Sequence, residues 1–124
     1  AMKQEAIAIA ELRAREARAM TEAAFTARVI VLAHELGWKV VHFRPARTAK
    51  GWRTPCEGDA EGWVDLILIS VKQKRTLFVE LKSEKGHITP AQEEWLETLR
   101  QAGEVPQVWR PSDFQYICEF LKGE

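Results

Sequence analysis

The chain has little of what marks disulfide-stapled, zinc-binding or membrane-spanning proteins. It has two cysteines in 124 residues, Cys56 and Cys118, and they lack the close spacing of a zinc or redox motif. No apolar run approaches the roughly 20 residues that a transmembrane helix needs. No basic, apolar leader opens the chain either, so we expect one domain in the cytoplasm.

An excess of charge of one sign is also missing. Lys and Arg number 18, as do Asp and Glu, so the formal net charge is zero, which argues against nucleic-acid binding by bulk electrostatics. The distribution is uneven, because every ionised side chain between Glu35 and Glu57 is basic and aromatic residues lie among them. This pattern favours a nucleic-acid backbone-binding surface, although a merely solvated basic loop explains it equally well. The candidate contacts are Arg44, Arg47, Lys50, Trp52 and Arg53.

Hydrophobic periodicity and capping residues predict the order of secondary structure. We expect helices over residues 3–19 and 21–36, a strand over 38–43 and a long loop over 44–61. Strands over 63–71 and 76–82 form a hairpin, followed by a helix starting at Thr89, a strand over 105–109 and a C-terminal helix. Both hairpin strands are apolar on both faces, so we expect them to be central in a sheet covered by helices on either side. The fold class is therefore an α/β sandwich.

Three charged residues of the hairpin share one face. Side chains alternate along a strand, so Glu80 and Lys82 point the same way. If the chain turns at residues 72–75, Asp65 lies beside Lys82 and diagonal to Glu80. One interpretation is a salt-bridge cluster. The other is a hydrolytic site for phosphodiesters, in which the carboxylates hold Mg²⁺ or Mn²⁺ and the lysine orients water, since zinc would require His or Cys ligands.

A longer pattern surrounds these residues. Its members are Gly62, Trp63, Val64, Asp65 and Leu66, then Val79, Glu80, Leu81 and Lys82, then Gly86, Thr89, Pro90, Gln92, Trp95 and Leu96. This pattern resembles the VRR-NUC group of the PD-(D/E)XK nucleases. The similarity extends upstream to Glu22, Phe25, Gly37 and Trp38 and downstream to residues 108–113, and so covers about residues 21–121.

The resemblance implies a restriction-endonuclease-like, three-layer α/β/α sandwich with a small mixed central sheet. It implies that Asp65, Glu80 and the backbone carbonyl of Leu81 bind the metal and that Lys82 is the catalytic lysine. It also implies site roles for Glu22 and Gln92. Each of these two residues has a structural alternative, because Glu22 suits a helix N-terminus and Gln92 suits a capping box. The family usually has proline where this chain has Val64, a position that shapes the strand entry and carries no chemistry.

The resemblance further implies a domain over residues 21–124 with a helical extension over residues 1–20, in a bacterial or phage-infected cell. Stand-alone members of the family imply a homodimer that cleaves branched DNA such as four-way junctions, with no organic cofactor and no membrane partner. Lys85 and His87 follow the active strand and are candidates for DNA contact. Two alternatives stay open: a non-catalytic DNA-binding or assembly module, and a nuclease for flap, single-stranded or RNA substrates.

Overall fold

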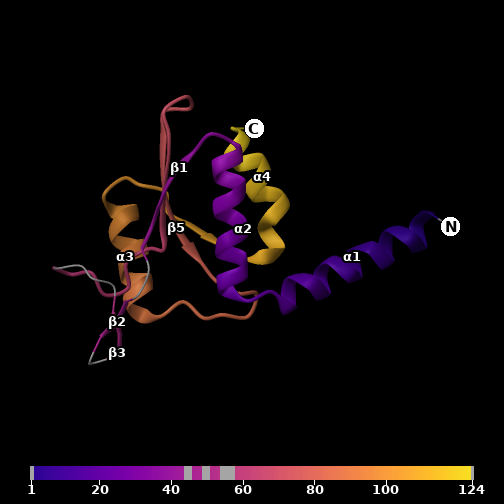
Figure 1. Cartoon of the computed structure of the whole chain (residues 1–124), viewed down its shortest axis with the longest axis horizontal. Helices are drawn as coiled ribbons and strands as arrows, with labels where there is room; N and C mark the ends of the chain where they lie inside the picture. Colours follow the sequence, from indigo (N-terminus) through magenta and orange to yellow (C-terminus); the bar gives the residue numbers. More distant parts are fainter. Residues whose placement is uncertain (1, 44–45, 49–50, 54–57, 124) are drawn as a thin grey trace.

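The computed structural model describes residues 2–43, 46–48, 51–53 and 58–123. In it, helices lie around a small β-sheet (Figure 1). The helices are α1 (Met2–Ala19), α2 (Glu22–Glu35), α3 (Pro90–Gln101) and α4 (Phe114–Lys122), with a short 3₁₀ helix η1 (Pro111–Asp113). The strands are β1 (Lys39–His42), β2 (Ala46–Thr48), β3 (Gly51–Arg53), β4 (Leu66–Ser70), β5 (Arg75–Leu81) and β6 (Gln107–Trp109).

The main sheet has the order β1-β4-β5-β6. The two pairs formed by β4, with β1 and with β5, are antiparallel, whereas β5 and β6 are parallel, so the sheet is mixed. The hairpin strands β4 and β5 occupy the two central positions, as their apolar character on both faces predicts.

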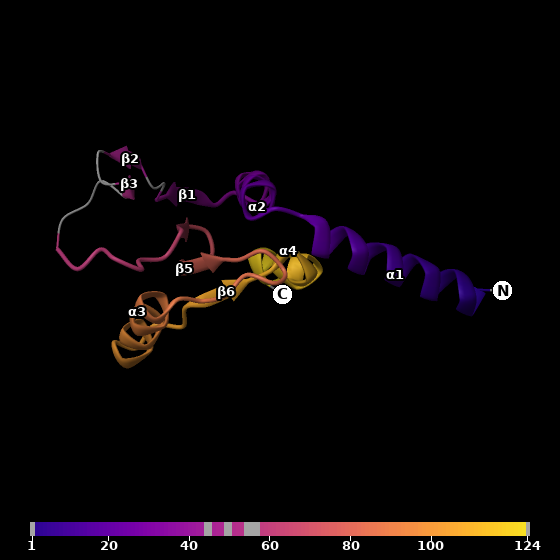
Figure 2. The ribbon, with the colours of Figure 1, turned by 90° about the horizontal axis from the view of Figure 1, so that it is seen from below.

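Helices cover both faces of this sheet (Figures 1 and 2). On one face the larger core joins α2 and α4 to the sheet through Phe25, Val29, Leu68, Ile117 and other buried residues. On the other face a smaller core joins α3 to the sheet. Its buried members are Val64, Leu96 and Leu99, with Trp63, Phe78, Ile88 and Val108 packed around them. The predicted α/β/α class is therefore confirmed.

Local sequence determines where the helices beside the sheet begin. Thr21 caps α2 by accepting a hydrogen bond at Oγ1 from the Ala24 amide (3.1 Å). Thr89 and Gln92 form a capping box at the start of α3: each side chain accepts a hydrogen bond from the other residue's backbone amide. Such caps satisfy amides that have no partner within the helix and place the first turn.

Three predicted boundaries are wrong. The segment predicted as a loop over residues 44–61 contains the antiparallel pair β2–β3, which forms a separate two-stranded sheet. Its sequence lacks the apolar alternation that indicates a strand. The hairpin's first strand begins at Leu66 instead of residue 63, after Gly62 adopts a positive φ of 79°. The last strand begins at Gln107 instead of residue 105, because ladder pairing with β5 starts there.

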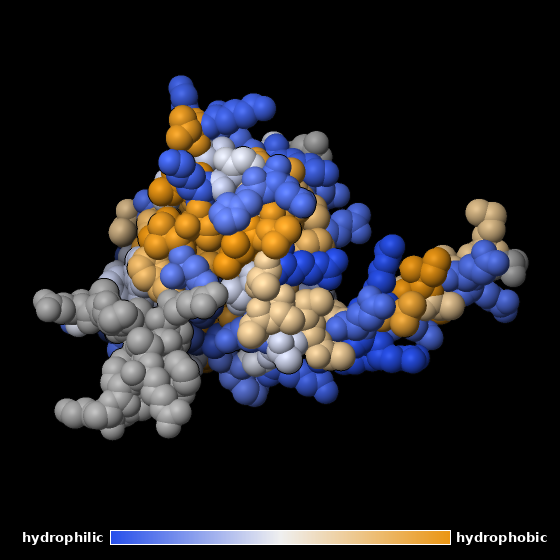
Figure 3. All heavy atoms as spheres, in the orientation of Figure 1, coloured by the Kyte–Doolittle hydropathy of each residue, from blue (hydrophilic) through white to orange (hydrophobic). Residues whose placement is uncertain are grey.

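Helix α1 projects away from the sheet and its covering helices (Figures 1 and 2). Of its 18 residues only Ala17 is buried, while Ile7, Ile9 and Leu12 are exposed. In the space-filling view, apolar side chains also gather on the surface of the main body (Figure 3). Across the part of the chain that the structure describes, no helix combines the length and apolar character needed to cross a membrane.

Candidate active site

The register of the central hairpin decides which charged residues are neighbours. Ser70 pairs with Arg75 and Leu66 pairs with Val79, so the turn occupies residues 71–74. The predicted turn at 72–75 is therefore displaced by one residue on each strand. The ladder ends with the pair of Leu66 and Val79, so Asp65 and Lys82 each lie one residue outside the strands, and the predicted register that pairs them is wrong by two residues. A total slip of two residues preserves which strand side chains share a face, and Asp65 lies close enough to Glu80 to raise its pKa.

Asp65 is held by the backbone of the opposite strand. The Leu81 amide donates a hydrogen bond to Asp65 Oδ2 (2.8 Å), and the Asp65 amide donates to the Val79 carbonyl (3.1 Å). These two bonds fix the aspartate at the point where β4 begins. The carboxylate therefore meets β5 without relying on a flexible loop for its orientation.

Glu80 is the most deeply buried acidic side chain of the site, with 1% of its surface exposed. Burial raises the pKa of Glu80 to about 9, with further contributions from the hydrogen bonding and negative charge of Asp65. Lys82 opposes this shift, and Glu22 adds to it. Among the described residues no donor reaches Glu80 Oε2. A hydrogen bond between the two carboxyl groups requires one of them to be protonated, so two ionised carboxylates leave this oxygen without a partner.

The other oxygen of Glu80 contacts helix α3. Gln92 Nε2 donates a hydrogen bond to Glu80 Oε1 (3.3 Å), while Gln92 Oε1 accepts one from the Thr89 amide (2.9 Å). Gln92 therefore caps α3 and also contacts the acidic cluster, while its predicted role in the site stays a prediction. Gly62 lies close by, because a Cβ built on it would be 2.7 Å from the Gln92 amide nitrogen.

Lys82 is buried, with 8% of its surface exposed, and no described acidic side chain forms an ion pair with it. The ion pairs within 4.0 Å among the described residues are those of Arg100 with Glu93 and Glu97. Lys82 thus influences Glu80 through space, without a direct ion pair among the described residues. This geometry disfavours the salt-bridge cluster, in which Lys82 would contact and neutralise Asp65 and Glu80.

Glu22 approaches from the first turn of α2. Its side chain is exposed overall, yet partial desolvation raises the pKa of its carboxyl. The negative charge of Asp65 raises this pKa further, and the positive charge of Lys82 lowers it. The structure therefore brings all five residues of the predicted catalytic set, Glu22, Asp65, Glu80, Lys82 and Gln92, into one electrostatic or hydrogen-bonded group.

The donor set fits a hard divalent cation bound by few protein ligands. Within the described ranges no group of three or more His, Cys, Asp or Glu side chains is arranged to hold a metal. Two adjacent carboxylates remain, one of which has a buried oxygen without a donor. A cation held by these carboxylates would offset the burial and the repulsion that raise the pKa of Glu80. Magnesium suits such a pair, because it binds through one or two carboxylates and keeps several waters.

The structure describes the side chains of only some of the predicted nucleic-acid contacts. Lys85 and His87 are exposed in the segment between β5 and α3. Arg44 and Lys50 lie outside the described residues. Arg47 lies in β2, and Trp52 and Arg53 lie in β3, but their side chains are also outside what the structure describes.

Arg110 has a role that charge and sequence position did not indicate. Its Nη1 donates to three backbone carbonyls of the segment after Lys82: Ser83 (2.8 Å), Glu84 (3.2 Å) and Gly86 (2.7 Å). Sequence reasoning could not separate this arginine from ordinary surface charge, because its acceptors are main-chain atoms 24–27 positions away.

A mixed sheet between helices, with two carboxylates and a buried lysine at the end of its central hairpin, defines a restriction-endonuclease-like domain. The VRR-NUC domain matches residues 5–110, and the chain belongs to this family of nuclease domains, whose substrate is DNA. The match begins inside α1 and so includes most of the predicted extension; the domain boundary at residue 20 stays a prediction. No curated protein and no solved structure matches the chain.

Proposed function

We propose that this protein is a metal-dependent DNA endonuclease with its active site at Asp65, Glu80 and Lys82. The observation that carries the proposal is the buried Oε2 of Glu80, which has no donor among the described residues and lies in a cluster with Asp65. A buried carboxylate oxygen without a partner is costly unless a proton or a cation satisfies it. Membership of a nuclease family favours the cation.

Each residue has a distinct task in this proposal. Asp65, Glu80 and the Leu81 carbonyl would hold Mg²⁺ or Mn²⁺, which when bound supplies positive charge opposite the phosphate and the leaving oxygen. Lys82 orients a water molecule for attack on phosphorus: the water oxygen forms the new P–O bond, the bond to the leaving oxygen breaks, and the proton that the water loses is balanced by one that the leaving oxygen takes up from solvent. Gln92 holds Glu80 through Oε1, and Glu22 adds negative charge beside Asp65.

Branched DNA is the proposed substrate and a homodimer the proposed assembly. Two active sites related by a two-fold axis suit a symmetric four-way junction. The exposed apolar side chains of α1 support a contact between copies through this projecting helix. A cytoplasmic location is part of the same proposal.

The test is cleavage of labelled linear, flap and four-way DNA by wild type, Asp65→Ala and Lys82→Ala in Mg²⁺, Mn²⁺ or chelator. We expect wild type to cut with either metal, and both variants to lose at least about 100-fold in rate. Lys72→Ala is the matched control, because Lys72 is an exposed lysine in the turn at the other end of β5.

The outcomes separate the alternatives. Cleavage that persists in the variants or in chelator contradicts the assigned site. Binding without cleavage of any DNA supports a non-catalytic module. Preferred cleavage of flap or single-stranded DNA, or of an RNA version of the strands, contradicts the proposed branched-DNA selectivity while leaving the site intact.

A further inference from the structure

The segment after Lys82 is joined to the end of β6 by a set of polar contacts. The Lys82 amide donates to the Trp109 carbonyl (3.0 Å), and the Ser112 amide donates to Glu84 Oε2 (3.0 Å). Between these two bonds lies the Arg110 side chain, with its three carbonyl acceptors. The five residues 82–86 are therefore bonded at both ends and in the middle to residues 109–112.

Arg110 is itself held in place. Its amide donates to Asp113 Oδ2 (2.8 Å), which fixes the backbone where η1 begins. Its guanidinium is half-buried and makes no ion pair within the described part of the chain. Bonds from a charged donor to neutral carbonyls are stronger than those between two neutral groups. The arginine therefore orders the segment through its hydrogen bonds alone.

The tied segment touches the lysine of the site. Ser83 and Gly86 close a turn through the bond from the Gly86 amide to the Ser83 carbonyl (3.1 Å). A Cβ built on Gly86 would lie 2.9 Å from Ser83 Oγ and 3.6 Å from Lys82 Cδ, so this turn passes against the lysine stem. Within the described ranges no ion pair holds the Lys82 ammonium group, and the turn restricts the lysine stem by packing against it.

We propose that Arg110 is a positioning residue for Lys82. Its hydrogen bonds to residues 83–86, here called the clamp, hold this segment in place, and the segment keeps the lysine directed toward the reacting phosphate. This inference rests on the proposed function for its catalytic consequence, but the clamp can be measured separately. Displacing a catalytic group by about 1 Å can cost about 100-fold in rate. Loss of the clamp is therefore expected to lower kcat while changing KM little.

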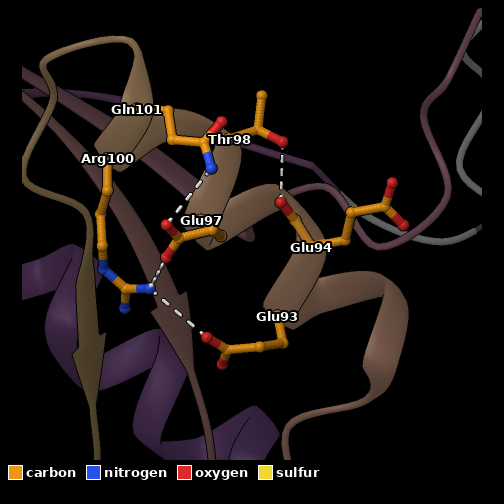
Figure 4. A network of polar contacts seen from close by, with 6 residues as sticks. All are labelled: Glu93, Glu94, Glu97, Thr98, Arg100 and Gln101. Carbon is orange, nitrogen blue, oxygen red and sulfur yellow. Dashed lines mark hydrogen bonds and ion pairs between the residues drawn. The ribbon is translucent and has the colours of Figure 1, made fainter.

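The first measurement is native-state hydrogen exchange of the Gly86 amide in wild type and Arg110→Ala. Removal of the guanidinium should speed exchange at Gly86 by about 10- to 100-fold, because the free energy of a hydrogen bond from a charged donor changes an opening equilibrium by about this factor. Arg110→Lys should retain part of the protection, because it keeps a charged donor. Arg100→Ala is the matched control: among the described residues Arg100 forms ion pairs with the exposed Glu93 and Glu97 of its own helix α3, so its loss should leave Gly86 unchanged (Figure 4).

The second measurement is single-turnover and steady-state cleavage of the best DNA substrate by the same variants. In Arg110→Ala we expect kcat to fall about 100-fold with KM nearly unchanged, and millimolar guanidinium to restore part of the rate. Guanidinium should not rescue Lys82→Ala, in which the positioned group itself is missing. Thermal unfolding of each variant ensures that rates are compared for folded protein.

The outcomes distinguish this inference from the proposed function. Unchanged exchange at Gly86, or a kcat for folded Arg110→Ala equal to that of wild type, overturns the positioning role even if the protein is a nuclease. A second outcome is that wild type cuts no DNA while Arg110→Ala still speeds exchange at Gly86. The proposed function and the catalytic part of this inference then both fail, and only the structural role of Arg110 stands.

Discussion

Substitution of Gly62 tests how closely the loop before Asp65 packs against α3. An alanine Cβ at this position would lie 2.5 Å from the Ala91 carbonyl carbon, 2.6 Å from its oxygen and 2.7 Å from the Gln92 nitrogen. All three are backbone atoms of the first helical turn, so no side-chain rotation can relieve the contact. Gly62→Ala must therefore displace either the loop or the start of α3.

The cost has two parts. The positive φ of 79° at Gly62 costs about 1–2 kcal/mol for a residue with a Cβ. Forcing packed backbone apart adds about 1–3 kcal/mol, as overpacking does elsewhere. Together these give a loss of about 2–5 kcal/mol in the free energy of unfolding, a large fraction of the stability of a typical domain.

Gly103→Ala separates the two parts. Gly103 follows the other end of α3 with φ of 94°, and nothing lies within 4 Å of a Cβ built on it. This variant should lose only about 1–2 kcal/mol. Urea unfolding with comparable m-values measures both changes. Equal losses for the two variants would refute the close approach of Gly62 to α3.

The same substitution should affect the site. A displaced α3 moves Gln92 away from Glu80, and it disturbs Trp63, which packs edge to face against Trp95 with ring centroids 4.8 Å apart. Folded Gly62→Ala should therefore bind Mn²⁺ more weakly than folded Gly103→Ala does. Equal metal affinity in the two variants would show that α3 does not support Glu80.

Two further predictions concern the acidic cluster and the projecting helix. Because the pKa of Glu80 is raised to about 9, its protonated form stabilises the metal-free fold below the ordinary value of 4.5, and this contribution is lost as the pH rises toward 9. Unfolding in chelator should show wild type losing stability relative to Glu80→Gln across this range, and a constant difference would contradict the raised pKa. If α1 joins two copies, light scattering should give about twice the 14.2 kDa chain mass, falling to one chain in Ile9→Glu/Leu12→Glu. A monomeric wild type would exclude the dimer.

Local patterns were sufficient to predict much of the fold. The caps at Thr21 and Thr89 depend on residues three positions apart, so they can be identified in the sequence. The apolar character of the hairpin strands likewise predicts a central position between helices. The short pair β2–β3 was missed because its strands are three residues long and carry no apolar face.

Because alternation along a strand is unaffected by a slip of two residues, the sequence alone predicts which residues of β4 and β5 share a face. The shared face of Asp65, Glu80 and Lys82 stays a prediction, since Asp65 and Lys82 lie just outside these strands. Which carboxylate faces which group was decided by the turn at residues 71–74, a property of the folded hairpin. Only the tertiary structure could bury Glu80 and bring Arg110 onto residues 83–86. It also leaves Lys82 without an ion pair to any residue that the structure describes. These features depend on contacts between distant segments and on exclusion of water, and neither is encoded in the spacing of neighbouring residues.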